Sequence, residues 1–219
     1  MPIEIELKAH IKDSNSMKLL LLEKAKYERM FEKEDTYWIS GGLTPDEKHA
    51  PLTIGLAPGQ QVKAMEPVTP VTRIRLRKEK RSYPDGTNDS FVFITCKIKK
   101  IIDGIEINNE QEFEIRSLQD AASGHDDADF EEFLNTIGCK LCAAKRKVGW
   151  LFSREEINAE LTKVEGLDWF IELEILASDN REETVSNEKA KLLSFLNELG
   201  IEKEAIESRF YTDMLKDKQ

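Results

Sequence analysis

The chain has 219 residues and a mass of 25.1 kDa, enough for one globular domain with a substantial core. Hydrophobic residues make up 40% and charged residues 34%, and the formal net charge is −10, which disfavours general binding to nucleic acids or anionic membranes. No apolar leader opens the chain and no run reaches the roughly 18 apolar residues of a membrane span, so we expect a cytoplasmic protein. Three cysteines, at 96, 139 and 142, are too few for a disulfide framework and are expected to be reduced thiols.

The first predicted element is a strand at residues 3–8, where apolar and ionised side chains alternate strictly. Successive side chains of a strand point to opposite faces, so Glu4, Glu6 and Lys8 share one face. An amphipathic edge strand with its charges in water would explain this hexapeptide on its own. The pattern gains meaning because it recurs later in the chain with the opposite charge.

A short helix is predicted at residues 17–26, where good helix formers follow three candidate N-cap residues, Asp13, Ser14 and Ser16. Aromatic residues then indicate an extended segment at 27–39. Residues 40–70 contain many glycines and prolines and are predicted to form a long loop. Such a loop is either a plain insertion or a lid over a binding site.

Three further strands are predicted, and the first and third of them carry charged faces of opposite sign. Residues 71–77 place Arg73, Arg75 and Arg77 on one face, within a stretch (71–100) that holds nine Lys and Arg against three Asp and Glu. After a turn at 83–86, a second strand at 91–99 completes a hairpin and carries a charged residue, Lys97. Beyond another turn at Asp103 and Gly104, a strand at 110–115 presents three glutamates on one face: Glu110, Glu112 and Glu114.

The C-terminal half is predicted to mix helices and strands. Helical spacing of apolar residues predicts a helix in the second half of 117–138, ended by Gly138. Extended segments follow at 141–152, with the basic run Lys145-Arg146-Lys147, and at 157–164 and 169–176, the last with Glu172 and Glu174 on one face. An amphipathic helix at 182–199 ends at Gly200, and a last short helix is expected at about 202–215.

Repeated charged faces backed by apolar faces suggest a sheet that closes into a barrel, with helices outside and the charges inside. Such an interior needs a charged occupant. Paired carboxylates are hard oxygen ligands for Mg²⁺ or Mn²⁺, and Arg and Lys bind phosphate oxygens. The pattern therefore predicts an α+β protein whose barrel binds a metal-bound polyphosphate.

The ordered motifs resemble those of the CYTH family, the triphosphate tunnel metalloenzymes. They are Glu4-x-Glu6-x-Lys8, Arg73-x-Arg75, Lys97, Glu112-x-Glu114, the basic strand at 145–147 and Glu172-x-Glu174. The resemblance covers most of the chain and implies an eight-stranded antiparallel barrel with helices on its outer face. It also implies a single domain over residues 1–219, with a small-molecule triphosphate as substrate.

Carried over by this resemblance, the metal ligands are Glu4, Glu6, Glu112, Glu172 and Glu174. Substrate binding is assigned to Lys8, Arg73, Arg75, Lys97, Lys145, Arg146 and Lys147, with Arg146 and Lys147 as alternatives for one role, and Glu4, Glu6, Lys8 and Lys97 form the catalytic group. Family members often carry an Asp before the final Glu-x-Glu pair; here Thr162 aligns with it, and Glu160 lies on the same face. Residues 208–211 resemble the C-terminal segment that caps the tunnel.

The resemblance implies a Mg²⁺- or Mn²⁺-dependent enzyme that hydrolyses inorganic tripolyphosphate, thiamine triphosphate or a nucleoside triphosphate. Two alternatives stay open: a class IV adenylyl cyclase, which makes cyclic AMP and pyrophosphate from ATP, and a module that binds triphosphate without turnover. The acidic residues favour an enzyme, since a pure anion binder gains little from carboxylates. A hydrolase is preferred to a cyclase because no stretch of the sequence indicates a base pocket. A homodimer is also left open.

Overall fold

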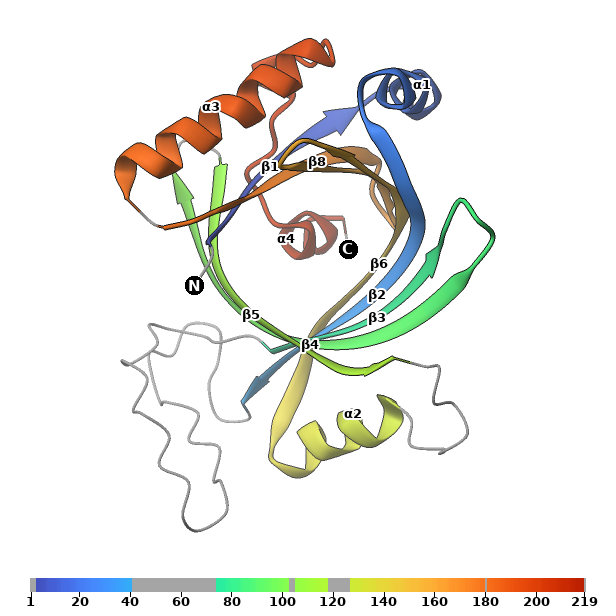
Figure 1. Cartoon of the computed structure of the whole chain (residues 1–219). Helices are drawn as coiled ribbons and strands as arrows, with labels where there is room; N and C mark the ends of the chain where they lie inside the picture. The colour runs from blue at the N-terminus through green and yellow to red at the C-terminus, as the bar shows by residue number, and fades with distance from the viewer. Residues whose placement is uncertain (1–2, 41–73, 103–104, 118–126, 180, 219) are drawn as a thin grey trace.

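The computed structural model describes residues 3–40, 74–102, 105–117, 127–179 and 181–218 (Figure 1). Eight strands and four α-helices account for most of this part of the chain. In order they are β1 (Ile3–Ile11), α1 (Ser14–Lys24), β2 (Lys26–Ser40), β3 (Ile74–Ser82), β4 (Asn88–Ile102), β5 (Ile105–Ser117), α2 (Asp127–Thr136), β6 (Cys139–Arg154), β7 (Ile157–Val164), β8 (Trp169–Ala177), α3 (Glu182–Glu198), the 3₁₀ helix η2 (Lys203–Ala205) and α4 (Tyr211–Lys216). The predicted loop at 40–70 and the turn at Asp103 and Gly104 lie outside the described residues, apart from Ser40, the last residue of β2.

All strand pairings are antiparallel, and they run in the order β1-β5-β4-β3-β2-β6-β7-β8. Because β1 pairs with both β5 and β8, the order returns to its start and the strands form a closed barrel. Figure 1 looks into the ring of strands, with α1, α2 and α3 outside it and α4 inside. The predicted α+β class with an antiparallel sheet is therefore confirmed.

The main hydrophobic core lies between the outer face of the barrel and two helices. On β1 it takes the apolar half of the alternation, so that Ile5, Leu7 and Ala9 are fully buried against the apolar side of α3 and against Leu21 of α1. Burial of these side chains fixes which way the strand faces, because a shift by one residue would move every side chain to the opposite face. The ionised half of β1 consequently faces the interior of the barrel.

The helix ends follow from local chemistry. The Asp13 carboxylate accepts hydrogen bonds from the backbone N–H groups of Asn15 and Ser16, at 3.0 and 3.1 Å, so α1 begins at Ser14, three residues earlier than the sequence predicts. Gly200 follows α3 with φ of 69°, a conformation that ends a helix at little cost only in glycine. No helix in the described part of the chain is long and apolar enough to cross a membrane.

The prediction of one last helix at about 202–215 is wrong. The segment contains the short η2, then an extended stretch, and only then α4. Ile206 forms a β-bridge with Ala9, and the Glu207 N–H donates to the Lys8 carbonyl at 2.8 Å, so this stretch pairs with β1. Tertiary pairing thus overrides the helical propensity of the sequence and carries the chain into the barrel.

Candidate functional site

Two of the predicted acidic motifs lie side by side on the inner face. β1 and β8 are neighbours in the barrel, and their register places Glu6 opposite Glu174 and Lys8 opposite Glu172. Glu4 lies one step further along the same face, opposite Leu176. The two Glu-x-Glu motifs, which come from opposite ends of the sequence, therefore share one region of the interior.

Two basic residues from the opposite side of the barrel contact the same aspartate. Arg77 donates two hydrogen bonds to Asp35 of β2, at 2.7 and 3.0 Å, and the Lys145 ammonium of β6 lies 3.4 Å from the same carboxylate. Asp35 is 1% exposed. Burial alone would raise the pKa of Asp35, but Arg77 and Lys145 hold it well below its usual range. Asp35 thus stays ionised and fixes two cations.

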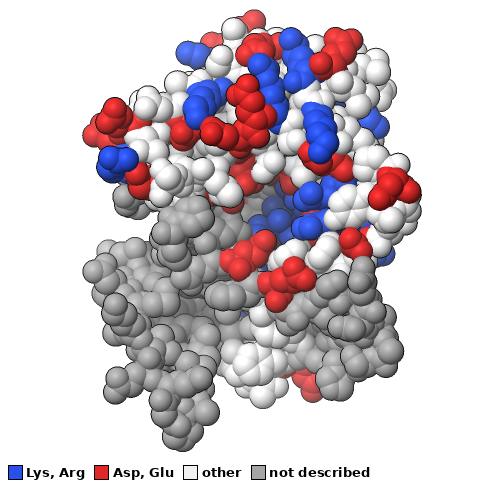
Figure 2. Space-filling model, in the orientation of Figure 1, with Lys and Arg blue, Asp and Glu red and all other residues white. Residues whose placement is uncertain are grey.

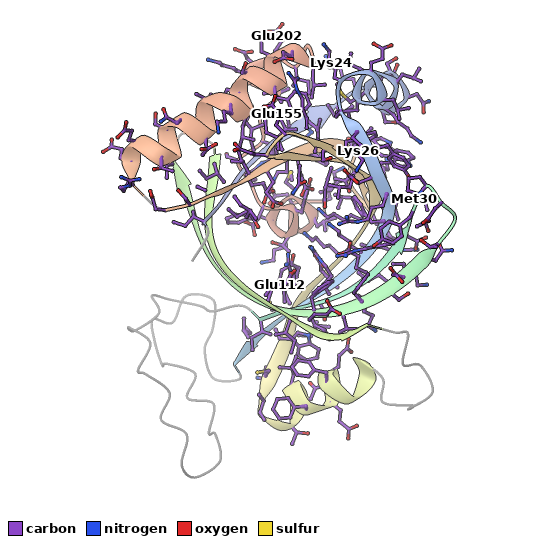
Figure 3. All side chains as sticks on the ribbon, viewed as in Figure 1. Lys24, Lys26, Met30, Glu112, Glu155 and Glu202 are labelled. Atoms are coloured by element: carbon purple, nitrogen blue, oxygen red, sulfur yellow. The ribbon has the colours of Figure 1, made fainter. Side chains whose placement is uncertain are left out.

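Arg75 lies beside Glu112, which the family resemblance assigns to the metal. Its guanidinium donates to Glu112 and to the Thr95 hydroxyl, both at 2.8 Å, and Thr95 in turn donates to Glu112 at 2.9 Å. In Figure 3, Glu112 extends into the ring of strands from the β4 and β5 side. A predicted phosphate ligand and a predicted metal ligand thus pair with each other in this structure.

A buried chain of ion pairs connects β2, β6, β7 and β8. The Lys147 ammonium lies 2.9 Å from Glu160 and 2.8 Å from Glu172, and Lys33 forms a short ion pair with Glu160. Lys147 and Lys33 are 4% and 5% exposed. Burial alone would lower the pKa of Lys147, but Glu160 and Glu172 raise it, so this ammonium stays charged.

The C-terminal segment completes the inner face near β1 and β8. The Tyr211 hydroxyl donates to Glu172 at 2.6 Å, and the Lys8 ammonium lies 4.5 Å from the centre of the Tyr211 ring. Lys8 also donates to the Arg209 carbonyl at 2.6 Å. Burial and the nearby Glu172 raise the pKa of Tyr211 well above 10, so its hydroxyl remains a proton donor. The resemblance of residues 208–211 to a capping segment agrees with this placement.

Adjacent residues of β6 have opposite environments. The side chain of Arg146 is 49% exposed and forms ion pairs with Glu32 and Glu34, at 3.0 and 3.5 Å, on the outer face of β2. Lys145 and Lys147 lie on the inner face. Of the two alternatives for one basic role, Lys147 is therefore the residue inside the barrel.

One predicted site residue is not described by the structure, and only the backbone of another is described. Arg73 lies outside the described residues. The backbone of Lys97 is on β4, opposite Glu110 of β5. Among the described residues, no group of three or more His, Cys, Asp and Glu side chains is arranged to hold a metal ion. The aligned Thr162 is buried next to the Val148 carbonyl, whereas Glu160 binds the two lysines.

The sequence pattern does not mark Lys33 and Asp35 as inner residues, and it marks Glu160 only as a residue on the same face as Thr162. A strand-by-strand search for an ionised residue at every second position would find all three, but it would also find outward charges such as Glu32 and Glu34. Figure 2 shows the outcome: Lys and Arg side chains gather in the hollow of the visible face, with acidic side chains around them. The fold and this inner face define a closed antiparallel barrel with a densely charged interior.

Comparisons with solved structures show a similar fold over nearly the whole chain. A protein from Pyrococcus horikoshii OT3 is 24% identical, with 99% of each chain covered and a TM-score of 0.69. A Vibrio parahaemolyticus protein assigned as an adenylate cyclase is 16% identical, with 98% of each chain covered and a TM-score of 0.65. A Hippeastrum protein assigned as an adenylyl cyclase, and described as having a dominant triphosphatase activity, is 14% identical to this chain. The match covers 99% of this chain and 96% of that chain, with a TM-score of 0.55.

At these identities the matches show the fold. No family model matches the sequence. No curated protein matches it either. The resemblance to the CYTH family that the motifs carry is consistent with the adenylyl cyclase and triphosphatase descriptions of the structural matches.

Proposed function

We propose that the protein is a divalent-metal-dependent triphosphatase with a single catalytic domain. The interior of the barrel would be the triphosphate tunnel in which the substrate binds. Candidate substrates are inorganic tripolyphosphate, thiamine triphosphate and nucleoside triphosphates. The observation that carries the proposal is the register of β1 and β8, which pairs Glu6 with Glu174 and Lys8 with Glu172 on the inner face. Carboxylates can bind a metal ion, and cations can bind phosphate oxygens. An interior that contains both is therefore suited to a polyphosphate with a bound metal ion.

The carboxylates of β1 and β8 would hold Mg²⁺ or Mn²⁺. Their oxygens are the hard donors that these ions prefer. Among the described residues, no three acidic side chains are already arranged to hold a metal ion, so the ligands would have to move on metal binding. Glu172 accepts hydrogen bonds from Lys147 and Tyr211, so a bound metal would share this carboxylate with them or replace one of them. When bound, the ion would polarise a phosphoryl oxygen and stabilise the charge that develops there.

The cations would bind and orient the phosphates. Arg75 can exchange Glu112 for a phosphate oxygen and keep its bond to Thr95, while Arg77 and Lys145 remain positioned by Asp35. Preorganised donors of this kind lower the barrier because little reorganisation is needed when charge develops on the phosphoryl group. Lys8 and Lys147 lie on the side of the carboxylates and would contact the phosphate nearest the metal.

An adenylyl cyclase is the second candidate, because the structural matches include proteins assigned as cyclases. A cyclase uses the ribose 3′-hydroxyl as nucleophile at the α-phosphorus and releases pyrophosphate, whereas a triphosphatase uses water and releases orthophosphate. The charged side chains of the inner face would bind phosphates and a metal ion, and neither role requires an adenine base. A hydrolase is therefore the simpler assignment.

A product assay tests the proposal. The protein is incubated with ATP, thiamine triphosphate and tripolyphosphate, with Mg²⁺, with Mn²⁺ and with EDTA, and orthophosphate, pyrophosphate and cyclic AMP are measured. We expect metal-dependent orthophosphate release, fastest from a small triphosphate. Cyclic AMP with matching pyrophosphate would replace the hydrolase by the cyclase. Tight triphosphate binding without any product would leave only the binding module.

A further inference from the structure

A second group of cations lies on the inner face, beyond the Lys33 and Lys147 ion pairs. Arg29 of β2 and Arg81 of β3 flank Glu79, which is 4% exposed. A register shift in β2 between Tyr27 and Arg29 places Arg29 opposite Leu151, two residues before the inward Phe31. This group is not part of the motifs that resemble the CYTH family.

Arg81 has several contacts in this group. Its Nε donates to Glu79 at 2.7 Å, and its guanidinium carbon lies 4.2 Å from the centre of the Phe91 ring and 5.5 Å from that of Phe93. The two rings stack with their centres 5.7 Å apart. The Arg81 guanidinium also has a hydrogen bond with the Tyr83 side chain. A guanidinium oriented by a carboxylate and an aromatic face is preorganised to donate its other N–H groups to a ligand.

Arg29 is poorly satisfied by comparison. Its Nε is buried and has no hydrogen-bond partner among the described residues, and its terminal nitrogen is 3.9 Å from Glu79, too far for a hydrogen bond. Charged buried donors normally have an acceptor, so this arginine calls for an oxygen ligand or an ordered water. The Arg29 and Arg81 side chains are 22% and 20% exposed, so a small ligand can reach the group.

The charges leave this group positive. Glu79 is matched by Arg81, and burial, which alone would raise the pKa of Glu79, is outweighed by Lys33 and Arg81, which lower it. Lys33 does not add to the excess, because its ammonium forms an ion pair with Glu160. One guanidinium charge, that of Arg29, is therefore left without a carboxylate at hydrogen-bond distance in the described part of the chain.

We propose that Arg29 and Arg81 form a second anion site, which binds a single tetrahedral oxyanion such as phosphate. Two guanidinium groups can donate to different oxygens of one tetrahedral anion, and phosphate is an oxyanion whose geometry matches the fork of arginine. Neither Arg29 nor Arg81 is among the predicted triphosphate ligands. Along β2 the buried Lys33 lies between Arg29 and Asp35, the carboxylate that holds Arg77 and Lys145. Phosphate binding here does not depend on the proposed triphosphatase activity.

The test is calorimetric titration with inorganic phosphate. Because the triphosphate region could also bind phosphate, the Arg75→Gln variant serves as the background, and Arg29→Gln and Arg29→Lys are added to it. Arg154→Gln is the matched control, since Arg154 forms an exposed ion pair with Glu198 on the outer surface. Circular dichroism and thermal unfolding check that each variant is folded, and Arg29→Lys keeps the charge if Arg29→Gln fails to fold.

We expect the Arg75→Gln protein to retain phosphate binding, and Arg29→Gln in that background to weaken this binding about tenfold or more. Arg29→Lys should weaken it less, because it keeps the charge but loses the forked geometry. Arg154→Gln should not change it. Loss of all phosphate binding in Arg75→Gln alone, or the same affinity with and without Arg29, would overturn the proposal. Neither result depends on whether triphosphates are hydrolysed.

Discussion

Arg146 and Lys147 are neighbours with the same charge and opposite environments, which makes them a matched pair. Lys147 is 4% exposed and compensates Glu160 and Glu172, so Lys147→Met leaves buried carboxylates without their main partner. Breaking a buried ion pair on one side costs about 3–5 kcal/mol, whereas an exposed pair contributes about 0–1 kcal/mol. Urea unfolding at pH 7 should therefore show a large loss for Lys147→Met and little for Arg146→Met. Similar losses in both variants would contradict the placement of Lys147 inside the barrel.

Lys145 gives a pH dependence to anion binding. Burial lowers the pKa of Lys145 from 10.5 to about 8, although Asp35 opposes the shift. Among its charged neighbours, Arg77 stays protonated and the pKa of Tyr211 is raised well above 10, so neither titrates near pH 8. Since a lowered lysine pKa means that the folded protein loses this charge as pH rises through about 8, binding of a triphosphate should weaken above that pH.

The measurement is calorimetry with a non-hydrolysable triphosphate at pH 7, 8 and 9. The dissociation constant of the wild type should rise above pH 8 by up to about tenfold per pH unit, the limit for one proton. Lys145→Gln should bind more weakly at pH 7 and show a flatter profile. Parallel profiles for the two proteins would remove Lys145 from the binding site.

At the residue scale the sequence could predict Glu6, Lys8, Glu172 and Glu174 because each belongs to a strand with charges on one face only. It could not predict Lys33 and Asp35 in the same way. β2 carries charges on both faces, since Glu32 and Glu34 point outward to Arg146, so no alternation marks the inner ones. Only their cross-strand partners, Glu160 and Arg77, which are distant in sequence, distinguish them.

At the scale of the elements, β6 and β7 approach each other closely at Gly149. A Cβ atom at this position would lie 2.2 Å from the Leu161 carbonyl oxygen and 2.9 Å from the Thr162 Cα, both backbone atoms that cannot turn aside. Gly149→Ala should therefore force β6 and β7 apart beside the Lys147 ion pairs and destabilise the protein by about 1–3 kcal/mol.

Gly138→Ala is the comparison for that variant. Gly138 has φ of 85°, and a Cβ atom added there would meet only open space, so its substitution strains the backbone without a clash. Thermal unfolding of both variants, together with triphosphate affinity, separates the two effects: only Gly149→Ala should also weaken binding. An alanine at 149 that leaves both stability and affinity unchanged would contradict the close approach of these strands.

Most of the strands and α3 could be predicted from periodicity because each has a continuous apolar face, whereas β2 is indicated by its aromatic residues. Gly138 and Gly200 have positive φ where the sequence predicts the end of a helix. The segment after Gly200 could not, because its residues favour a helix locally while Ile206 and Glu207 pair with β1, at the other end of the chain. Distant pairing of this kind leaves no periodic signal in the segment itself.

At the scale of the whole molecule, the interior of the barrel contains many ionised side chains, unlike an ordinary hydrophobic core. They remain charged because they pair with one another across strands: Arg77 with Asp35, Arg75 with Glu112, and Lys147 with Glu160 and Glu172. Replacing buried ion pairs with apolar residues is often neutral or stabilising, so such a network adds little to stability by itself. A charged ligand gives the network a function that folding does not require.

The most direct test of that claim compares an inward with an outward glutamate in metal-dependent release of orthophosphate from tripolyphosphate. Glu6 lies opposite Glu174 on the inner face, whereas Glu34 is 57% exposed beside Arg146. With Mg²⁺, Glu6→Gln should lower kcat by about 100-fold, as expected when a group that holds the metal acts mainly in the transition state, and Glu34→Gln should stay within about twofold of the wild type. EDTA should abolish the activity of the wild type. Equal rates for Glu6→Gln and the wild type, or a rate that survives EDTA, would contradict the proposed metal site inside the barrel.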